Sequence, residues 1–270
     1  MMNKEKSMPF LHHLSALRKH LIRASLGVII AGIVAFIFRG VLFDGLLLAP
    51  KSPDFISYRV LCLLSEMTEI RSLCIENINI ELLNSKMAGQ FSLHISLSLI
   101  AGVVFSFPFI LREIWAFVSP GLTFKEREKS VAFISISSLL FFLGAAFGYF
   151  LIVPLSVQFL SNYIVSDQII NFIETSSYLS TIASIILACG FLFELPIVIY
   201  FLSRAGLVTP AFMKTYRRHA WIIILIISSI ITPPDIFSQV IVSIPVALLY
   251  ELSVLISKIA QPKKIIINEA

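Results

Sequence analysis

Glu194 is the residue of this chain whose surroundings most suggest a special role. It lies inside a long apolar run, between Phe193 and Leu195. A carboxylate within a membrane-spanning helix costs about 2.5–3.5 kcal/mol on insertion scales, so it usually faces a cavity or a polar partner. Two interpretations stay open. Glu194 has a functional role facing a cavity, or it makes a structural hydrogen bond to a neighbouring helix, helped by the backbone that Pro196 frees.

Catalytic chemistry finds little support in the sequence. We find no Ser/His arrangement, paired Asp motif or His-Glu-x-x-His helix, which argues against an intramembrane enzyme. The three cysteines lack the spacing of a zinc or iron–sulfur site, and no Gly-rich phosphate loop occurs. We therefore expect no catalytic residue, no metal and no cofactor.

The composition is that of an integral membrane protein. Of the 270 residues, 57% are apolar and 14% are charged, against about 45–50% and roughly 25% in soluble domains. So few ionised side chains cannot cover the water-facing surface of a soluble chain of this size. The composition excludes a soluble enzyme, a disordered chain and a coiled-coil rod.

Apolar runs of about 20 residues are long enough to cross a hydrocarbon core of ~30 Å. The sequence predicts an all-α polytopic protein with six spans, the last two short, at 24–43, 87–111, 131–153, 178–202, 219–232 and 237–256. Pro233 and Pro234, followed by Asp235, separate the last two spans, because consecutive prolines cannot continue a helix. A re-entrant hairpin formed by these two short helices is the alternative.

The basic residues predict the orientation. Sixteen of the 21 Lys and Arg residues lie in 1–23, 112–130, 203–218 and 257–270. By the positive-inside rule these segments, both termini included, face the cytoplasm. Residues 1–23 are expected to form an amphipathic lead-in helix along the interface, and 257–270 a cytoplasmic tail. The isoelectric point near 9.2 then reflects topology and not a nucleic-acid partner.

Residues 44–86 are expected to form a long periplasmic loop. The segment is acidic, and we expect a short helix in it. Cys62 and Cys74 lie there, on the oxidising side of a bacterial envelope, so they could form a disulfide or remain two buried thiols. Cys189, inside the fourth span, is assigned to packing, and His94, in the second span, is expected to be packed and hydrogen-bonded.

Four strings in chain order resemble the motifs of one family. They are the stretch from His13 to Leu21, the stretch from Phe107 and Pro108 through Trp115 and Pro120 to Arg127, Phe193-Glu194-Leu195-Pro196, and the stretch from Thr232 to Gln239. Each string is a weak signal alone, but the four occur in order on the predicted topology. Together they resemble TatC, the multispanning subunit of the twin-arginine protein translocase.

This resemblance implies a function. A TatC-like protein would bind the signal peptides of folded proteins, whose consecutive arginines are recognised at the cytoplasmic face. It would recruit single-span partner subunits of the TatA/TatB type into an oligomeric complex in the bacterial inner membrane. Transport would be driven by the protonmotive force, with no enzymatic activity in this subunit.

The resemblance also assigns residues to the recognition of arginine. Glu126 matches the family's loop acid, and a carboxylate can hold a guanidinium group in a bidentate fork. The further candidates on this surface are Arg18, Glu113, Lys125 and Arg127. The family's second acid is absent, because Ala16 occupies its position, so half of the expected site is missing.

The remaining motif residues are assigned to shape and to partner contact. The resemblance places Glu194 on a concave face that holds the signal peptide or a polar residue of a partner. The residues expected to shape the groove and the turns are Phe107, Pro108, Trp115, Pro120, Pro196, Pro233, Pro234, Asp235 and Gln239.

Two other functions stay open. A proton-coupled secondary transporter could use Glu194 and His94, but it should show inverted repeats, and we find none. A membrane scaffold that recognises no signal is compatible with Ala16 in place of the family's acid.

Overall fold

The structure is a computed structural model that describes residues 10–68, 80–119, 130–163, 166, 172–232 and 236–260. The elements in chain order are α1 (Phe10–Ile37), the π-helix η1 (Val41–Leu47), the 3-10 helix η2 (Ala49–Lys51), α2 (Ile56–Thr68), β1 (Leu82–Leu83), α3 (Gly89–Val118), α5 (Ser130–Phe147), the π-helix η5 (Gly148–Ile152), α6 (Val153–Asn162), β2 (Ile173–Glu174), α7 (Thr175–Phe193), α8 (Leu195–Arg204), α9 (Pro210–Thr215), α10 (Arg217–Ile231) and α11 (Ile236–Ala260). The chain divides into two compact units, residues 1–45 with 86–139 and residues 46–85 with 140–270.

Five helical runs in the described residues are long and apolar enough to cross a membrane. They are Leu14–Ile37, Gly89–Val118, Ser130–Asn162, Thr175–Arg204 and Gln239–Ala260. They confirm the predicted all-α polytopic class. The 15 residues of α10 reach only about 22 Å at 1.5 Å per residue, so the sixth crossing stays a prediction.

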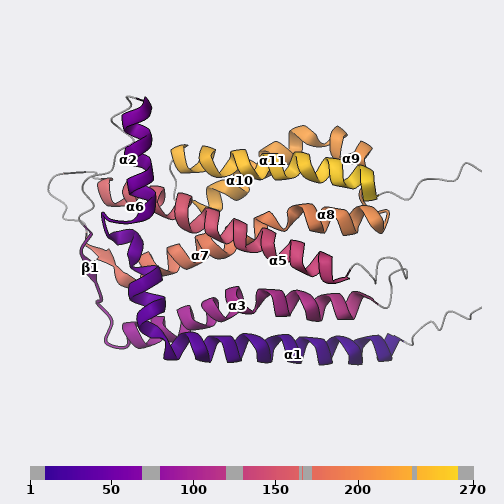
Figure 1. The fold of residues 1–270 in the computed structure, drawn as a ribbon, viewed down its shortest axis with the longest axis horizontal. Coiled ribbons are helices and arrows are strands. Elements are labelled where there is room, and N and C mark those ends of the chain that lie inside the picture. Colours follow the sequence, from indigo (N-terminus) through magenta and orange to yellow (C-terminus); the bar gives the residue numbers. More distant parts are fainter. Residues whose placement is uncertain are drawn as a thin grey trace, which may run out of the picture. The chain divides into compact units, whose positions relative to one another are not determined.

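The first unit is built on an antiparallel pair of long helices, α1 and α3, which lie side by side (Figure 1). Glycines allow their close approach. A Cβ atom at Gly102 would lie 2.6 Å from the carbonyl oxygen of Val28, and one at Gly27 would lie 2.6 Å from the ring of Phe109. Because the helices run in opposite directions, the first turns of α1 meet the last turns of α3.

The predicted lead-in helix and first span form one continuous helix in the structure. α1 runs from Phe10 to Ile37 without a break, where a separate helix over 1–23 and a turn into the span were expected. The physical reason is the absence of any proline or glycine between Phe10 and Leu26. Helix propagation through such a stretch needs no new nucleus.

The third predicted span, 131–153, is part of a longer helical run. α5 belongs to the first unit as far as Leu139 and to the second from Leu140, and it continues through η5 into α6, which ends at Asn162. Pro154 lies in the first turn of α6. A proline cannot donate the helical hydrogen bond, and the wider turns of η5 just before it keep the run helical.

The core of the second unit contains a close contact between α5 and α7. A Cβ atom at Gly144 would lie 2.5 Å from the carbonyl oxygen of Cys189, and one at Gly190 would lie 2.7 Å from the ring of Phe141. Phe141 and Cys189 are almost fully buried. This confirms the assignment of Cys189 to packing.

The last helices of the second unit are joined by polar contacts. The Ser203 hydroxyl of α8 donates to the Ser257 hydroxyl of α11 at 2.8 Å, in a buried position. The Gln239 amide of α11 donates to the carbonyl oxygen of Leu225 in α10 at 3.2 Å. Gln239 therefore connects α10 to α11. α11 has 25 residues, so the prediction that the last span is short was wrong.

The segment before α2 is anchored by buried tyrosines of the second unit. The Tyr58 hydroxyl donates to the carbonyl oxygen of Pro50, and the Tyr149 hydroxyl donates to that of Leu46, each at 2.8 Å. Burial raises the pKa of the Tyr58 hydroxyl, so it stays protonated and remains a donor. The predicted short helix in 44–86 is α2.

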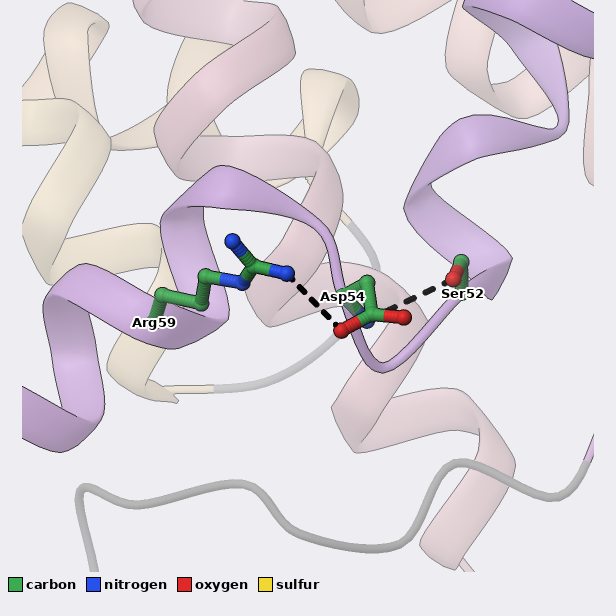
Figure 2. A network of polar contacts seen from close by, with 3 residues as sticks. All are labelled: Ser52, Asp54 and Arg59. Atoms are coloured by element: carbon green, nitrogen blue, oxygen red, sulfur yellow. Dashed lines mark hydrogen bonds and ion pairs between the residues drawn. The ribbon is translucent and has the colours of Figure 1, made fainter.

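The start of α2 also carries an exposed polar network (Figure 2). The Arg59 guanidinium donates to the Asp54 carboxylate at 2.9 Å, and the Asp54 backbone N–H donates to the Ser52 hydroxyl at 3.4 Å. The two charged side chains are 66% and 84% exposed. Ion pairs so open to solvent contribute little to stability.

Two connections complete the second unit. β1 and β2 pair in parallel, with Leu82 opposite Ile173, a pairing that the apolar pattern did not predict. Cys62 is disulfide-bonded. Cys74 lies outside the described residues, so the pairing of these two cysteines stays a proposal.

Candidate functional site

A buried carboxylate is held at the end of the first unit where α1 begins and α3 ends. Nδ1 of His20 lies 2.7 Å from Oε2 of Glu113. The side chain of His20 is 21% exposed and that of Glu113 is 11% exposed. A charge-assisted hydrogen bond of this length fixes the position of the carboxylate.

Aromatic contacts occur near this end of α3. Phe117 meets the His20 ring edge-on, with the ring centroids 6.3 Å apart. Trp115 stacks on Phe133 at the start of α5, with centroids 4.7 Å apart. The role of Trp115 in shaping the groove stays a prediction.

The surface around the pair is basic. Arg18, Lys19 and Arg112 are exposed neighbours of His20 and Glu113 in the sequence. A carboxylate has about four acceptor positions, and His20 uses one of them. The Glu113 carboxylate can therefore accept further hydrogen bonds from a cationic ligand.

The other predicted recognition residues fall outside the described part of the chain. Pro120, Lys125, Glu126 and Arg127 lie in residues 120–129, so no geometry is assigned to them. Phe107 is buried and Pro108 lies inside α3, which continues past it. Their role in shaping the groove stays a prediction.

Glu194 lies at a break between two helices. The fourth predicted span, 178–202, lies within the candidate span Thr175–Arg204, in which α7 ends at Phe193 and α8 begins at Leu195. The carbonyl oxygen of Glu194 accepts from the backbone N–H groups of Ile197 and Val198, each at 3.0 Å. Pro196 lies in the first turn of α8, where its missing N–H has no helical partner to lose.

Glu194 is buried at the junction of two helices. It is 8% exposed, and it is both the C-cap of α7 and the N-cap of α8. The partial negative charge at the end of α7 and the partial positive charge at the start of α8 oppose each other there. The junction therefore places a buried carboxylate between two helix ends of opposite charge.

Of the Thr-Pro-Pro-Asp motif, the structure describes only the first residue, Thr232. Thr232, 4% exposed, ends α10 with its hydroxyl donating to the carbonyl oxygen of Ser228 at 2.9 Å. Pro233, Pro234 and Asp235 lie outside the described residues. Their predicted turn therefore stays a prediction.

His94 is a packed, hydrogen-bonded histidine, as predicted. Its ring stacks on Phe36, with centroids 3.8 Å apart, and meets Phe43 edge-on. Its Nε2 lies 3.1 Å from the carbonyl oxygen of Phe36. In the residues that the structure describes, no group of three His, Cys, Asp or Glu side chains could hold a metal ion.

The pairing of His20 with Glu113 was not predicted from the sequence. The predicted topology could have indicated this pairing. If the segment between the first two spans lies on one side of the membrane, the helices α1 and α3 run in opposite directions. In such a pair the start of the first helix must meet the end of the second. His20 and Glu113 are the residues of those two ends that can exchange a hydrogen bond deep in the contact.

These features define a class of protein, a polytopic helical membrane protein with one carboxylate fixed at a helix end and another at a helix break. The family model for the Sec-independent protein translocase protein TatC matches residues 12–245. The chain belongs to the TatC family.

Individual relatives agree with this assignment. The TatC protein of Blattabacterium sp. subsp. Periplaneta americana (strain BPLAN) is 39% identical over 98% of this chain and 100% of its own length. The TatCy protein of Bacillus subtilis (strain 168) is 31% identical over 96% of this chain and 92% of its own length.

Two solved structures are similar in fold. One crystal structure of the twin-arginine translocase receptor TatC has a TM-score of 0.67 at 29% identity, covering 92% of this chain and 99% of that one. A second, described as the receptor in DDM, has a TM-score of 0.70 at 30% identity, covering 91% and 99%.

Proposed function

We propose that this chain is the receptor and core subunit of a twin-arginine protein translocase. Its likeness to structures of the twin-arginine translocase receptor, over nine-tenths of both chains, carries this proposal. The subunit binds signal peptides with consecutive arginines at the cytoplasmic membrane face and takes no catalytic step itself. Transport of the folded cargo is driven by the protonmotive force.

The complex lies in the bacterial inner membrane in this proposal, and the distribution of basic residues supports a cytoplasmic position of both termini. Single-span subunits of the TatA/TatB type join it, and several copies form an oligomeric complex. Glu194 supplies a buried carboxylate for the apolar part of the signal peptide or for a polar residue of a single-span partner.

Glu113 and Glu126 form the arginine-binding site in this proposal. Glu126 is the loop acid that the family motif identifies. Glu113 supplies a second carboxylate, and its partner His20 lies one helical turn from Ala16, on the same face of α1. A carboxylate delivered from α3 thus compensates for the acid that α1 lacks at position 16.

Crosslinking of a twin-arginine precursor to this protein in membrane vesicles tests the proposal. Each substitution removes a hydrogen bond to a charged group, so Glu126→Ala and Glu113→Ala should each lower crosslinking at least roughly tenfold. Replacing both arginines of the precursor should have the same effect. Ala16→Glu should restore part of the signal lost in Glu113→Ala.

Glu251→Ala is the matched control. Glu251 has its own cationic partner, with Oε2 2.7 Å from Arg217, and belongs to the second unit. Its removal should leave precursor crosslinking unchanged. Equal crosslinking of precursors with and without the two arginines would overturn signal recognition and favour the membrane scaffold. Proton-dependent uptake of a small solute by the purified protein would favour the transporter.

A further inference from the structure

The second unit contains a cavity of about 320 Å³ between α6 and the first half of α7. Its walls are mainly aliphatic, with Val153 and Val157 on one side and Ile182 and Ile185 on the other. An apolar cavity of about 150 Å³ already takes up benzene. This one has room for a larger apolar group.

Two buried hydroxyls line this cavity. Tyr178 is 6% exposed and Ser156 is 2% exposed, and both belong to the cavity wall. Neither the Tyr178 hydroxyl nor the Ser156 hydroxyl has a hydrogen-bond partner within the described part of the chain. Buried hydroxyls without a partner are costly, so each calls for an explanation.

Two neighbouring tyrosines have the hydrogen-bond acceptor that Tyr178 lacks. Tyr178 lies within electrostatic range of Tyr58 and Tyr149. These two donate to carbonyl oxygens of the chain, those of Pro50 and Leu46. Among these three tyrosines, Tyr178 lines the cavity and its hydroxyl has no acceptor in the described residues. A ligand that offers an acceptor would satisfy it.

The wall also excludes a charged ligand. None of the described residues lining the cavity is an Asp, Glu, Lys, Arg or His; Tyr163, Ser177 and Thr181 add only hydroxyl groups. An ion in such surroundings would lack a compensating charge. The ligand is therefore a neutral group with an acceptor oxygen on an apolar body.

The position of the cavity along α7 limits the class of ligand further. Tyr178 lies three residues from the start of α7 and Ile185 ten, which corresponds to about 4.5 Å and 15 Å along the helix. Both helices belong to runs that could cross a membrane. The cavity therefore extends from the polar boundary of the bilayer into its hydrocarbon layer.

We infer that this cavity binds the ester and upper acyl chain of a membrane glycerolipid. The ester carbonyl oxygen accepts from the hydroxyls of Tyr178 and Ser156, and the methylene groups pack against the aliphatic wall. The site requires only that the chain lies in a membrane and does not depend on signal recognition.

Photocrosslinking tests the site. The full chain is reconstituted in nanodiscs of phosphatidylethanolamine and phosphatidylglycerol, doped with phosphatidylethanolamine that carries a diazirine on its upper acyl chain. We expect crosslinked peptides to be enriched in residues 153–163 and 175–185. Tyr178→Phe and Ser156→Ala each remove one hydrogen bond and should lower this crosslinking roughly two- to tenfold. Ser156→Leu fills the cavity and should lower it further.

Two matched controls separate the site from general lipid contact. Ser180→Ala removes an exposed hydroxyl of α7 that donates to Ser176, and Tyr149→Phe removes a hydroxyl that donates to Leu46. Neither should change the crosslinking. Equal losses in the controls, or crosslinks distributed evenly over the lipid-exposed helices, would overturn the inference.

The change of Tm on addition of lipid tests the site even if a variant folds poorly. Phosphatidylethanolamine added to delipidated protein should raise the Tm of the wild type and of Ser180→Ala, but raise that of Tyr178→Phe less. Equal shifts in all three proteins would contradict a specific site. Displacement of the crosslink by an isoprenoid quinone and not by unlabelled phosphatidylethanolamine would also overturn the assignment to a glycerolipid.

Discussion

Glu113 in the first unit and Glu194 in the second are both 8% exposed, yet different features hold them in place. Glu113 lies within a continuous helix, and a side chain from another helix, His20, contacts it at 2.7 Å. Glu194 lies where the helix is interrupted, and its own backbone begins α8. A tertiary contact holds the first carboxylate, whereas the second belongs to a residue at the junction of α7 and α8, two residues before Pro196.

In the proposed function the two carboxylates have different roles. Glu113, held by a side chain of another helix, would exchange that partner for a cationic ligand that arrives from water. Glu194, inside a candidate span, would contact a group that arrives through the bilayer. The two residues should therefore respond differently to the same kind of substitution.

The largest effects are expected where glycines bring the helices together. In Gly102→Leu the new Cβ would lie 2.6 Å from the Val28 carbonyl oxygen, and backbone cannot move aside as a side chain can. The loss of stability should be about 3 kcal/mol, the upper part of the range for overpacking. Gly102→Leu should also separate His20 from Glu113 and thereby abolish precursor crosslinking. The two measurements are the crosslinking and the Tm of the purified protein.

Gly40→Leu is the control for this substitution. Its Cβ would meet only the Asp44 carboxylate, at 3.9 Å, so the Tm should change little. Retention of both wild-type Tm and crosslinking in Gly102→Leu would show that the α1–α3 contact does not position Glu113.

An intermediate effect is expected when the charge at Glu194 is removed. Glu194→Gln keeps the size and hydrogen-bonding capacity of the side chain, and its backbone can still begin α8. Export of a twin-arginine precursor should fall roughly tenfold, because a hydrogen bond to a charged group is replaced by a neutral one. The Tm should stay near that of the wild type, which separates a contact role from a structural one.

His20→Ala provides the contrasting measurement in the first unit. It leaves Glu113 chemically intact but removes its partner, so precursor crosslinking and the Tm should both decrease. Wild-type export from Glu194→Gln, together with a lower Tm, would mean that Glu194 only makes a structural hydrogen bond.

The smallest effect is expected at the exposed network of α2. Arg59→Ala breaks a 2.9 Å ion pair with Asp54, but solvent screens such pairs, and the change in the free energy of unfolding should stay below about 0.5 kcal/mol. Tyr58→Phe, one residue away, removes a buried hydrogen bond to Pro50 and should cost about 1 kcal/mol. Thermal unfolding of the two variants checks this order, and a larger loss in Arg59→Ala would contradict it.

Local signals explain what could be predicted. Composition and helix-breaking residues within a few turns predicted the long helices, the short α2 and the short α10. They also predicted the packing of Cys189. The predicted separation of the lead-in helix from the first span was wrong, because no proline or glycine interrupts α1 over 10–23. The span predicted at 178–202 lies within the candidate span Thr175–Arg204, which passes from α7 to α8 at Glu194, just before Pro196.

The sequence by itself determined a membrane protein of the TatC family, since hydropathy, charge placement and short motifs are properties of the chain alone. The tertiary structure decided which side chains meet. The contact of His20 with Glu113 joins residues 93 positions apart, and the cavity at Ser156 and Tyr178 needs two helices at a fixed distance. Such contacts depend on helix register and close packing, which the glycines of each unit set and no local pattern encodes.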